Sequence, residues 1–300
     1  MSAQDPLQRS RDRLDTDVRN SDIGAGYAQM LNFFVDPSIS ASRLDADDGT
    51  RYDVFKLPLQ YEFALDERDW RIAVRGTLSH AAAENEFSLA GFDDIDGTWE
   101  ADSAQLGLGV ILPAGEYFSW FLSGQFGISR LENDTDYGGP GAQAIFAPLL
   151  DGILFNWETN ARILGLGVGL DYKRRFAEMY DARITTRFSY NQIESYSESR
   201  DLPSFREETG TLSVSADIDH PWSLSLGSLP LFGTVHLGAS AFTGQNRNVL
   251  GFTHFYLAGY SVGLNVAETN RFFEAFSLGA HVNFGGDVDG YSLRFAWRLK

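Results

Sequence analysis

The sequence predicts an all-β protein, a transmembrane antiparallel up-and-down β-barrel of about twelve strands that follows a short polar N-terminal segment. Aromatic residues make up 14% of the 300 residues, and there are 30 glycines and no cysteine, a composition typical of many-stranded β proteins. Many segments alternate apolar with small or polar residues, which is the period of a strand with one apolar face. No stretch approaches the roughly 18 consecutive apolar residues of a spanning helix, so a helical membrane protein is excluded.

Charge and composition exclude several classes of function. The formal net charge is −17 and the pI is about 4.6, whereas a nucleic-acid-binding protein needs a basic face to meet phosphate. Without cysteine there is no disulfide, thiolate nucleophile or cysteine zinc site. We therefore expect no nucleic-acid partner, and we predict no cofactor and no metal site.

The polar residues 1–21 are predicted to be separate from a barrel over 22–300. They lack the apolar core of a secretory signal, which leaves open whether an export signal was removed or an initiator methionine was added to a mature chain. Two interpretations of the segment remain open. It is either a lumenal plug, in which Arg9, Arg11 and Arg13 pair with charges of the barrel, or a periplasmic tail.

The alternation is clearest in 276–285 and in 163–172, where large apolar residues oppose glycine and polar residues. The connections between such segments alternate in length, as in outer-membrane barrels with long outer loops and short periplasmic turns. An even number of strands then places both ends of the barrel on the periplasmic side. The predicted strands are 23–34, 52–64, 70–82, 100–112, 118–131, 158–172, 181–194, 208–218, 231–243, 252–266, 275–284 and 290–299. The predicted long loops are 35–51, 83–99, 132–157 and 195–207, and the last three connections are compact.

The two faces of the strands favour a membrane barrel over a soluble one. If the apolar faces pointed inward, glycines would face water and the enclosed core would have to accept nearly every large side chain. With the apolar faces outward, lipid covers them and the closed sheet leaves no unpaired backbone in the bilayer. Aromatic residues near the strand ends are expected at the headgroup level. Those expected near the long loops are Trp99, Trp157, Tyr190, Phe252 and Tyr256.

The closing segment Tyr291-Ser-Leu-Arg-Phe295-Ala-Trp297-Arg-Leu299-Lys300 resembles the C-terminal strand of bacterial outer-membrane proteins, although it ends on leucine and lysine rather than an aromatic residue. Together with twelve glycine-rich strands and a helical-looking leading segment, it resembles an autotransporter β-domain, in particular the solitary autotransporter-like barrels. The resemblance implies a monomer in the outer membrane of a Gram-negative bacterium. It implies contact with outer-membrane lipid and lipopolysaccharide, insertion by the barrel assembly machinery, and a polar helix that closes the barrel.

Charged residues on the inward faces form the candidate site. One interpretation is an anion-attracting pore or a charged bed for a plug. The other, which we favour because charges in so confined a space must pair, is a salt-bridge network that fills a narrow barrel. The predicted network comprises Glu62, Arg71, Arg75, Asp171, Arg183, Arg187, Asp217, His236, His281, Arg294 and Arg298.

Acidic segments at 45–50, 92–100 and 132–139 have carboxylates at calcium-like spacing beside glycine. None completes a calcium loop, since Lys56 stands where the closing carboxylate of the first would lie. A solvated outer surface, sharing divalent ions with lipopolysaccharide, is the favoured interpretation.

Catalysis is the weakest candidate. Rim histidines His80 and His254, with Ser79, Ser195 or Thr253 as nucleophiles, suggest a lipid hydrolase, but no third residue is evident. We expect no enzyme, and predict a narrow or plugged pore of the autotransporter type. A lipid hydrolase and a surface adhesin or receptor are the alternatives. The apolar connection 138–156 either constricts the mouth or lies on the rim.

Overall fold

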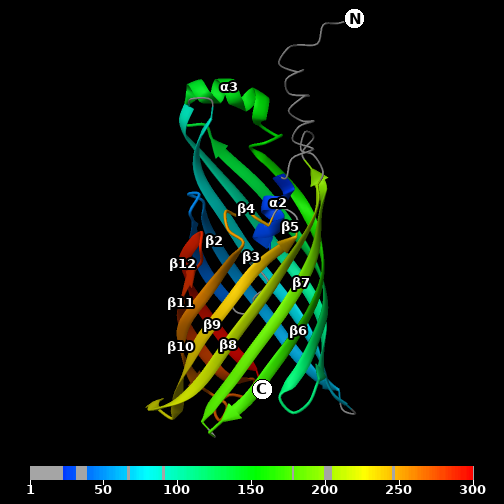
Figure 1. The fold of residues 1–300 in the computed structure, drawn as a ribbon, viewed down its shortest axis with the longest axis vertical. Helices are drawn as coiled ribbons and strands as arrows, with labels where there is room; N and C mark the ends of the chain where they lie inside the picture. The colour runs from blue at the N-terminus through cyan, green and yellow to red at the C-terminus, as the bar shows by residue number, and fades with distance from the viewer. Residues whose placement is uncertain are drawn as a thin grey trace, which may run out of the picture.

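Residues 23–31, 39–65, 68–89, 92–177, 179–198, 205–244 and 247–299 are described by the computed structural model. Twelve strands in these ranges form a closed barrel in which each strand pairs antiparallel with its sequence neighbour (Figure 1). The first strand pairs with the last, with Ile39 opposite Phe295, and this pairing closes the sheet. The predicted all-β, up-and-down barrel of about twelve strands is confirmed.

The barrel strands are supplemented by two described helices. No helix in the described ranges is long and apolar enough to cross a membrane. The elements are α2 (Ile23–Met30), β1 (Ile39–Ala46), β2 (Arg51–Leu65), β3 (Arg68–Leu89), β4 (Phe92–Pro113), β5 (Phe118–Asp136), α3 (Pro140–Leu150), β6 (Trp157–Phe176), β7 (Tyr180–Glu198), β8 (Arg206–Leu226), β9 (Leu229–Gly244), β10 (His254–Asn265), β11 (Phe273–Phe284) and β12 (Val288–Leu299).

An apolar belt surrounds the outside of the barrel. On β6, Leu164 and Leu166 point outward and are 52% and 69% exposed, whereas Gly165 between them faces the lumen. Toward α3 the outward face of the same strand changes to Arg162 and Glu158. Neighbouring strands change at the same level, where outward ion pairs form a charged collar. The collar consists of Arg43–Asp53, His80–Asp102, Arg130–Glu158 and Arg162–Glu194.

Inward glycines make room for polar side chains that cross the lumenal surface. Gln125 of β5 and Asn191 of β7 flank Gly165 in the register of β6. The Gln125 amide donates to Asn191 Oδ1 at 2.8 Å, directly over the glycine. A Cβ at position 165 would overlap both side chains, which explains why glycine alternates with leucine on this strand.

The predicted first strand, 23–34, is wrong over 23–31, and its residues 32–34 lie outside the described residues. Residues 23–30 form helix α2, and the first strand begins only at Ile39. Tyr27, Met30 and Leu31 are buried and lie three and four positions apart, which places them on one helical face. The predicted long loop 35–51 is likewise wrong at its C-terminal part, because β1 occupies 39–46 and a tight turn follows.

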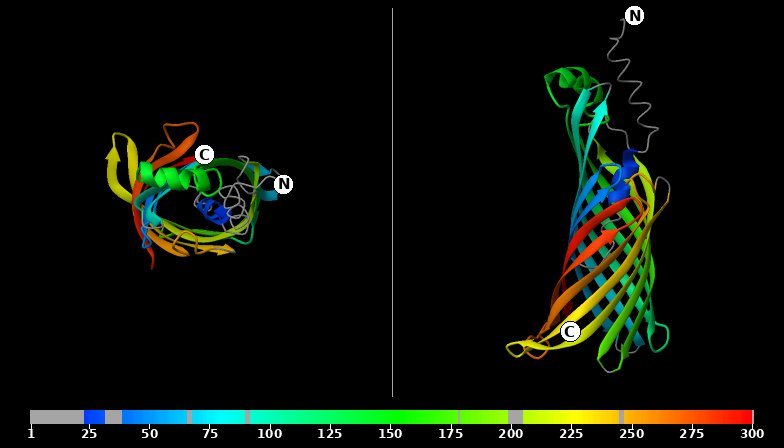
Figure 2. Two further views of the ribbon diagram at one scale, coloured as in Figure 1. Left: turned by 90° about the horizontal axis from the view of Figure 1, so that it is seen from above. Right: turned by 60° about the vertical axis from the view of Figure 1, so that its left-hand side comes forward.

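Two further predicted loops are strand. In place of the loop 83–99, β3 continues to Leu89 and β4 begins at Phe92, so that each strand is 22 residues long. About ten residues suffice for a strand to cross a membrane, so these strands project well beyond the belt. The same wall includes β5, which ends at Asp136, and α3 lies at its tip (Figures 1 and 2). Within the predicted loop 195–207, β7 extends to Glu198 and β8 begins at Arg206.

Helix α3 has its own small core. Phe146 and Leu150 of the helix are buried against Ile95 of β4 and against Tyr137. The Tyr137 hydroxyl donates to Asp151 Oδ1 at 2.6 Å. This hydrogen bond joins the segment that precedes the helix to the residue that follows it. The apolar connection 138–156 therefore packs on the projecting wall, as the rim alternative predicts.

A lumenal seal and a charged chamber

The lumen is divided into two parts of opposite character. At the α3 end, the apolar face of α2 packs against inward side chains of most of the strands, and we call this packed layer the apolar seal (Figure 2). Ala28 of α2 is 0% exposed, and Tyr27, Met30 and Leu31 are almost as deeply buried. The wall of the seal comprises Leu44, Ala46, Tyr52, Val54, Ala81, Ala83, Ala101, Leu131, Trp157, Ala161, Ile163, Ile193, Phe242, Leu250, Phe252 and Val288.

Tyr27 anchors the helix in the seal. Its ring lies 5.1 Å from the ring of Trp157, and its hydroxyl donates to the backbone carbonyl of Glu132 at 2.8 Å. Burial raises the pKa of the Tyr27 phenol well above its usual value, and the charges of Glu132 and Glu100 act in the same direction. The phenol therefore remains a neutral donor at physiological pH, as this hydrogen bond requires.

Three aromatic residues expected at the membrane interface face the lumen instead. Trp157 and Phe252 are 3% and 1% exposed and belong to the seal, and Trp99 packs against it. Tyr190 and Tyr256 do point outward and are 40% and 45% exposed. The prediction misplaced these three rings because it did not include helix α2. Without a helix to pack against, it expected a polar interior with no large apolar side chains.

Below the seal lies a cavity of about 820 Å³, which we call the chamber. Its upper limit includes Leu31 of the seal, and it extends to Arg71, Lys173 and Arg298 near the end opposite α3. Among the described residues, eight lysine and arginine side chains line it but only four carboxylates do. These are Lys56, Arg71, Arg75, Lys173, Arg183, Arg187, Arg294 and Arg298 against Glu62, Asp171, Asp217 and Glu274. Asp219, which lies behind Arg183 and Arg298, adds a fifth carboxylate, so the cations still outnumber the acids. The chamber is therefore positive in a protein whose net charge is −17.

One wall of the chamber holds two arginines over a single ring. Arg187 lies 4.6 Å and Arg75 lies 5.6 Å from the centroid of Phe121. Arg187 also pairs with Asp171 at 2.7 Å, whereas Arg75 donates to the Gln60 amide oxygen at 2.9 Å. On the adjoining strands, Arg71 pairs with Glu62 at 2.7 Å.

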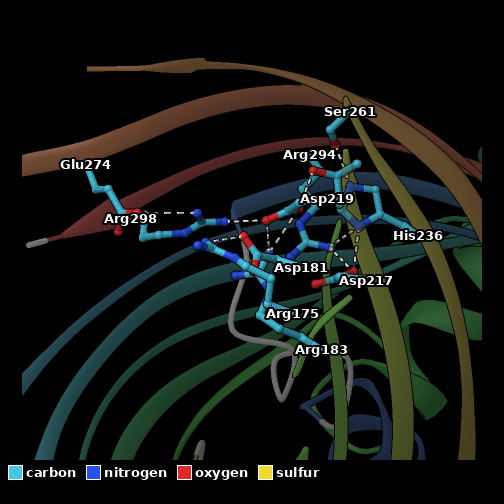
Figure 3. Close-up of polar contacts among 11 residues, drawn as sticks. Arg175, Asp181, Arg183, Asp217, Asp219, His236, Ser261, Glu274, Arg294 and Arg298 are labelled. Atoms are coloured by element: carbon cyan, nitrogen blue, oxygen red, sulfur yellow. Dashed lines mark hydrogen bonds and ion pairs between the residues drawn. The ribbon is translucent and has the colours of Figure 1, made fainter. Parts of the chain in front are cut away.

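The opposite wall is organised around Asp219 (Figure 3). Arg298 Nη2 donates to Asp219 Oδ2 at 2.8 Å, and Arg183 Nη2 contacts the same oxygen at 3.1 Å. Thr234 donates its hydroxyl to the other carboxylate oxygen at 2.7 Å. Arg298 further approaches Glu274 at 3.7 Å. One carboxylate thus holds two cations from distant strands.

Asp217, His236 and Ser261 form a linear chain on β8, β9 and β10. His236 Nδ1 lies 2.6 Å from Asp217, and His236 Nε2 lies 2.7 Å from the Ser261 hydroxyl. These are the contacts of a hydrolase triad, but Ser261 is only 2% exposed and packs against Gly279 behind the histidine. The chain instead fixes the His236 ring, which also meets His281 edge-on at 5.0 Å.

The residues of the predicted charge network all line the chamber. Its lining includes all eleven predicted members, and they fall into the two groups described above. Sequence reasoning missed Asp219, Glu274 and Lys173, because the predicted strands ended a few residues too early. It also missed Lys56, which shares the inward face of β2 with Glu62. The period of two could have identified it, because the two residues are an even number of positions apart. Residues 1–21, the predicted plug or tail, lie outside the described residues.

The rim side chains do not assemble a serine–histidine pair. Ser79 is 8% exposed and faces the lumen, whereas its neighbour His80 points outward to Asp102. The Ser195 hydroxyl accepts from the backbone N–H of Phe205 at 2.9 Å. His254 contacts Thr253, at 3.1 Å. In the described part of the chain, these pairs provide no triad at the rim.

Two of the acidic segments, 45–50 and 132–139, have local partners. Asp45 pairs with Arg51, and Asp48 accepts from the Thr50 N–H at 2.9 Å to close the β1–β2 turn. Within the described ranges, no group of three or more His, Cys, Asp or Glu residues is arranged to hold a metal ion. Glu132 joins the collar by pairing with Arg130 at 3.0 Å.

Comparison with protein families identifies this architecture. Residues 40–298 match the model described as "Solitary outer membrane autotransporter beta-barrel domain". The chain belongs to this family. This match confirms the resemblance to solitary autotransporter barrels that the closing strand and the strand count indicated. A search of curated protein sequences finds no significant match.

Solved structures share the fold of this solitary autotransporter barrel. The translocator domain of the autotransporter NalP from Neisseria meningitidis is 12% identical, with a TM-score of 0.58 over 92% of this chain and 96% of that one. The β-domain of the Bordetella autotransporter BrkA is 7% identical, with a TM-score of 0.56 over 87% of this chain and 96% of that one. At such identities the likeness concerns the fold alone.

Proposed function

We propose that this solitary autotransporter barrel is a plugged outer-membrane pore, in which α2 closes the lumen and its displacement opens a conduit. The single observation that carries the proposal is the apolar seal, in which Ala28 is 0% exposed and Tyr27 is held by Trp157. A helix buried on this scale resists water and ions, because a hydrated path would have to separate packed apolar side chains.

The apolar belt and the charged collar support a location in the outer membrane. Apolar side chains such as Leu166 would be covered by lipid, and the ion pairs of the collar would lie at the headgroup level. With the long β3–β5 wall outside, α2 closes the extracellular end and the chamber opens toward the periplasm. Outer-membrane lipid, lipopolysaccharide at the collar and the barrel assembly machinery are the proposed partners of a monomeric, non-catalytic barrel.

Conductance in planar bilayers tests the plug. Ala28→Arg introduces a guanidinium at the centre of the seal, where an uncompensated charge cannot be accommodated. We expect the refolded wild type to be silent or to open rarely, and A28R to conduct steadily. A variant lacking residues 2–31 should conduct at the same level or above it, whereas a variant lacking only 2–21 should remain closed.

The matched control is Ala144→Arg, the same substitution at an exposed position of α3. It should conduct no more than the wild type. All variants must first show the heat-dependent mobility shift of a folded barrel in SDS gels. A wild type as conductive as A28R would contradict the plug, and so would a folded 2–31 deletion that stays silent.

A further inference from the structure

The guanidinium N–H donors around Asp219 and Asp217 exceed the acceptors within their hydrogen-bond reach, because the Nε groups of Arg183 and Arg294 are buried without a partner. Asp219 already accepts from Arg183, Arg298 and Thr234, so both of its oxygens are engaged. Arg294 lies 3.9 Å from Asp217, beyond hydrogen-bond distance, although within reach of an ion pair. Its one hydrogen-bond contact among the described residues is with His236 Nδ1, at 3.2 Å.

That contact cannot coexist with the shorter one beside it. His236 Nδ1 lies 2.6 Å from the Asp217 carboxylate, which can only accept, so Nδ1 must carry a hydrogen and donate it. A nitrogen that donates to Asp217 cannot also accept from Arg294. Arg294 is therefore the cation of this cluster that lacks an acceptor, and its Nε is buried without a hydrogen-bond partner.

Arg183 also has a guanidinium donor without an acceptor. Its Nε is also buried and without a partner, although its Nη2 reaches Asp219. Arg183, Arg294 and Arg298 all line a recess of about 170 Å³ at the side of the chamber, together with the hydroxyl-bearing Thr234 and Ser277. The three arginine side chains (Figure 3) remain 32%, 21% and 35% exposed, and all three line the chamber, so a solute can reach them from the lumen.

From this geometry we propose that Arg294 and Arg183, with Arg298 beside them, bind the oxyanion group of a small soluble solute, a phosphate or a carboxylate. Guanidinium groups present paired N–H donors that match two oxygens of such an anion. The anion supplies acceptors to the guanidinium donors of Arg294 and Arg183 that Asp217 and Asp219 do not reach. It enters through the chamber, whose excess of cations raises the local concentration of anions. This site adds a ligand class to the proposed pore and does not require α2 to move.

Inorganic phosphate is the first probe. Thermal unfolding of the full-length protein in neutral detergent is followed while phosphate replaces chloride at constant ionic strength. We expect a saturable rise in the unfolding temperature. Arg294→Gln should weaken phosphate binding by about tenfold or more, the loss expected when charge-assisted hydrogen bonds are deleted. Arg294→Lys keeps the positive charge but loses the paired N–H donors of the guanidinium group, so it should bind phosphate with intermediate affinity.

Arg162→Gln is the matched control, because it removes an arginine from the outward collar and leaves the lumen unchanged. It should bind phosphate as the wild type does. A non-saturable response, an R294Q variant that is folded and binds normally, or equal losses in R162Q and R294Q would each overturn the site.

Two further arms separate the sources of the oxyanion. Acetate at the same ionic strength reports a carboxylate, and saturation by either acetate or phosphate supports the site. Nanodiscs with phosphatidylglycerol, compared with neutral phosphatidylcholine nanodiscs, report a lipid headgroup. Stabilisation by phosphatidylglycerol without any response to phosphate or acetate would overturn the proposal. Because these readouts involve no current, they are independent of the conductance test of the plug.

Discussion

Arg298 of β12 donates to Asp219 of β8 at 2.8 Å, and the contact joins strands that have β9, β10 and β11 between them. Hydrogen bonds of the ladder connect only neighbouring strands, so this ion pair is a cross-brace on the inside of the barrel. Arg183 of β7 shares the same carboxylate. The closing strand of the barrel is thereby tied to the middle of the sheet near the end opposite α3.

Asp219→Asn should destabilise the barrel, because it leaves two guanidinium groups without their carboxylate. Removing one partner of a fully buried pair costs about 3–5 kcal/mol. Since about a third of each arginine is exposed and screened, we expect roughly 2 kcal/mol. The measurement is the denaturant midpoint of the refolded protein, read from the folded band in SDS gels.

Asp181→Asn is the control for this substitution. Asp181 makes a well-formed pair with Arg175 at 2.8 Å, but that arginine is 66% exposed. The midpoint should change little. Equal shifts in the two variants would show that the cross-brace contributes no more than a surface pair.

Gly233→Ala should impair the fit between β9 and β10 on the lipid-facing side. A Cβ at position 233 would overlap the Tyr260 hydroxyl, which Trp222 Nε1 and His220 Nε2 contact at 3.1 and 2.8 Å. The tyrosine therefore cannot swing away freely, and overpacking of this kind costs about 1–3 kcal/mol. We expect a lower denaturant midpoint for G233A.

The double variant G233A with Tyr260→Ala discriminates the cause. If the overlap is responsible, adding Gly233→Ala to the Y260A background should cost much less than adding it to the wild type. Equal costs in both backgrounds would assign the effect to the backbone of β9 instead.

Tyr137 should make the packing of α3 sensitive to alkaline pH. Burial, followed by the hydrogen bond to Asp151 and its charge, raises the pKa of the Tyr137 phenol above its usual value of about 10. A group whose pKa is raised on folding stabilises the folded form below the unfolded pKa, and this stabilisation is lost as the pH rises through the folded pKa. The α3 packing should therefore be intact near pH 8 and loosen in strongly alkaline solution.

Tyrosinate absorbance of the wild type minus that of Tyr137→Phe isolates this titration. Its midpoint should lie above that of free tyrosine. Asp151→Asn removes the carboxylate and should lower the midpoint. A wild-type midpoint at the free value would contradict the buried hydrogen bond.

Much of the barrel follows from local pattern. The alternation in 163–172 and 276–285 predicts strands with an apolar outer face, and period two alone places Asp171, Arg183 and Arg294 inside. The ends of the strands were harder to predict from the sequence, because Asp219, Glu274 and Lys173 lie where the apolar alternation has already faded. At those positions, pairing with the neighbouring strand decides, and one sequence segment does not contain that information.

The sequence by itself determined the closed, lipid-facing barrel and the charged character of its lumen, because side-chain alternation is a local property of each strand. Only the tertiary structure decided that residues 23–30 form a helix, since their apolar face belongs to a packed layer with side chains from most of the strands. The same holds for the partners of the lumenal charges. Arg298 and Asp219 are 79 residues apart, and only the closure of the barrel brings them together.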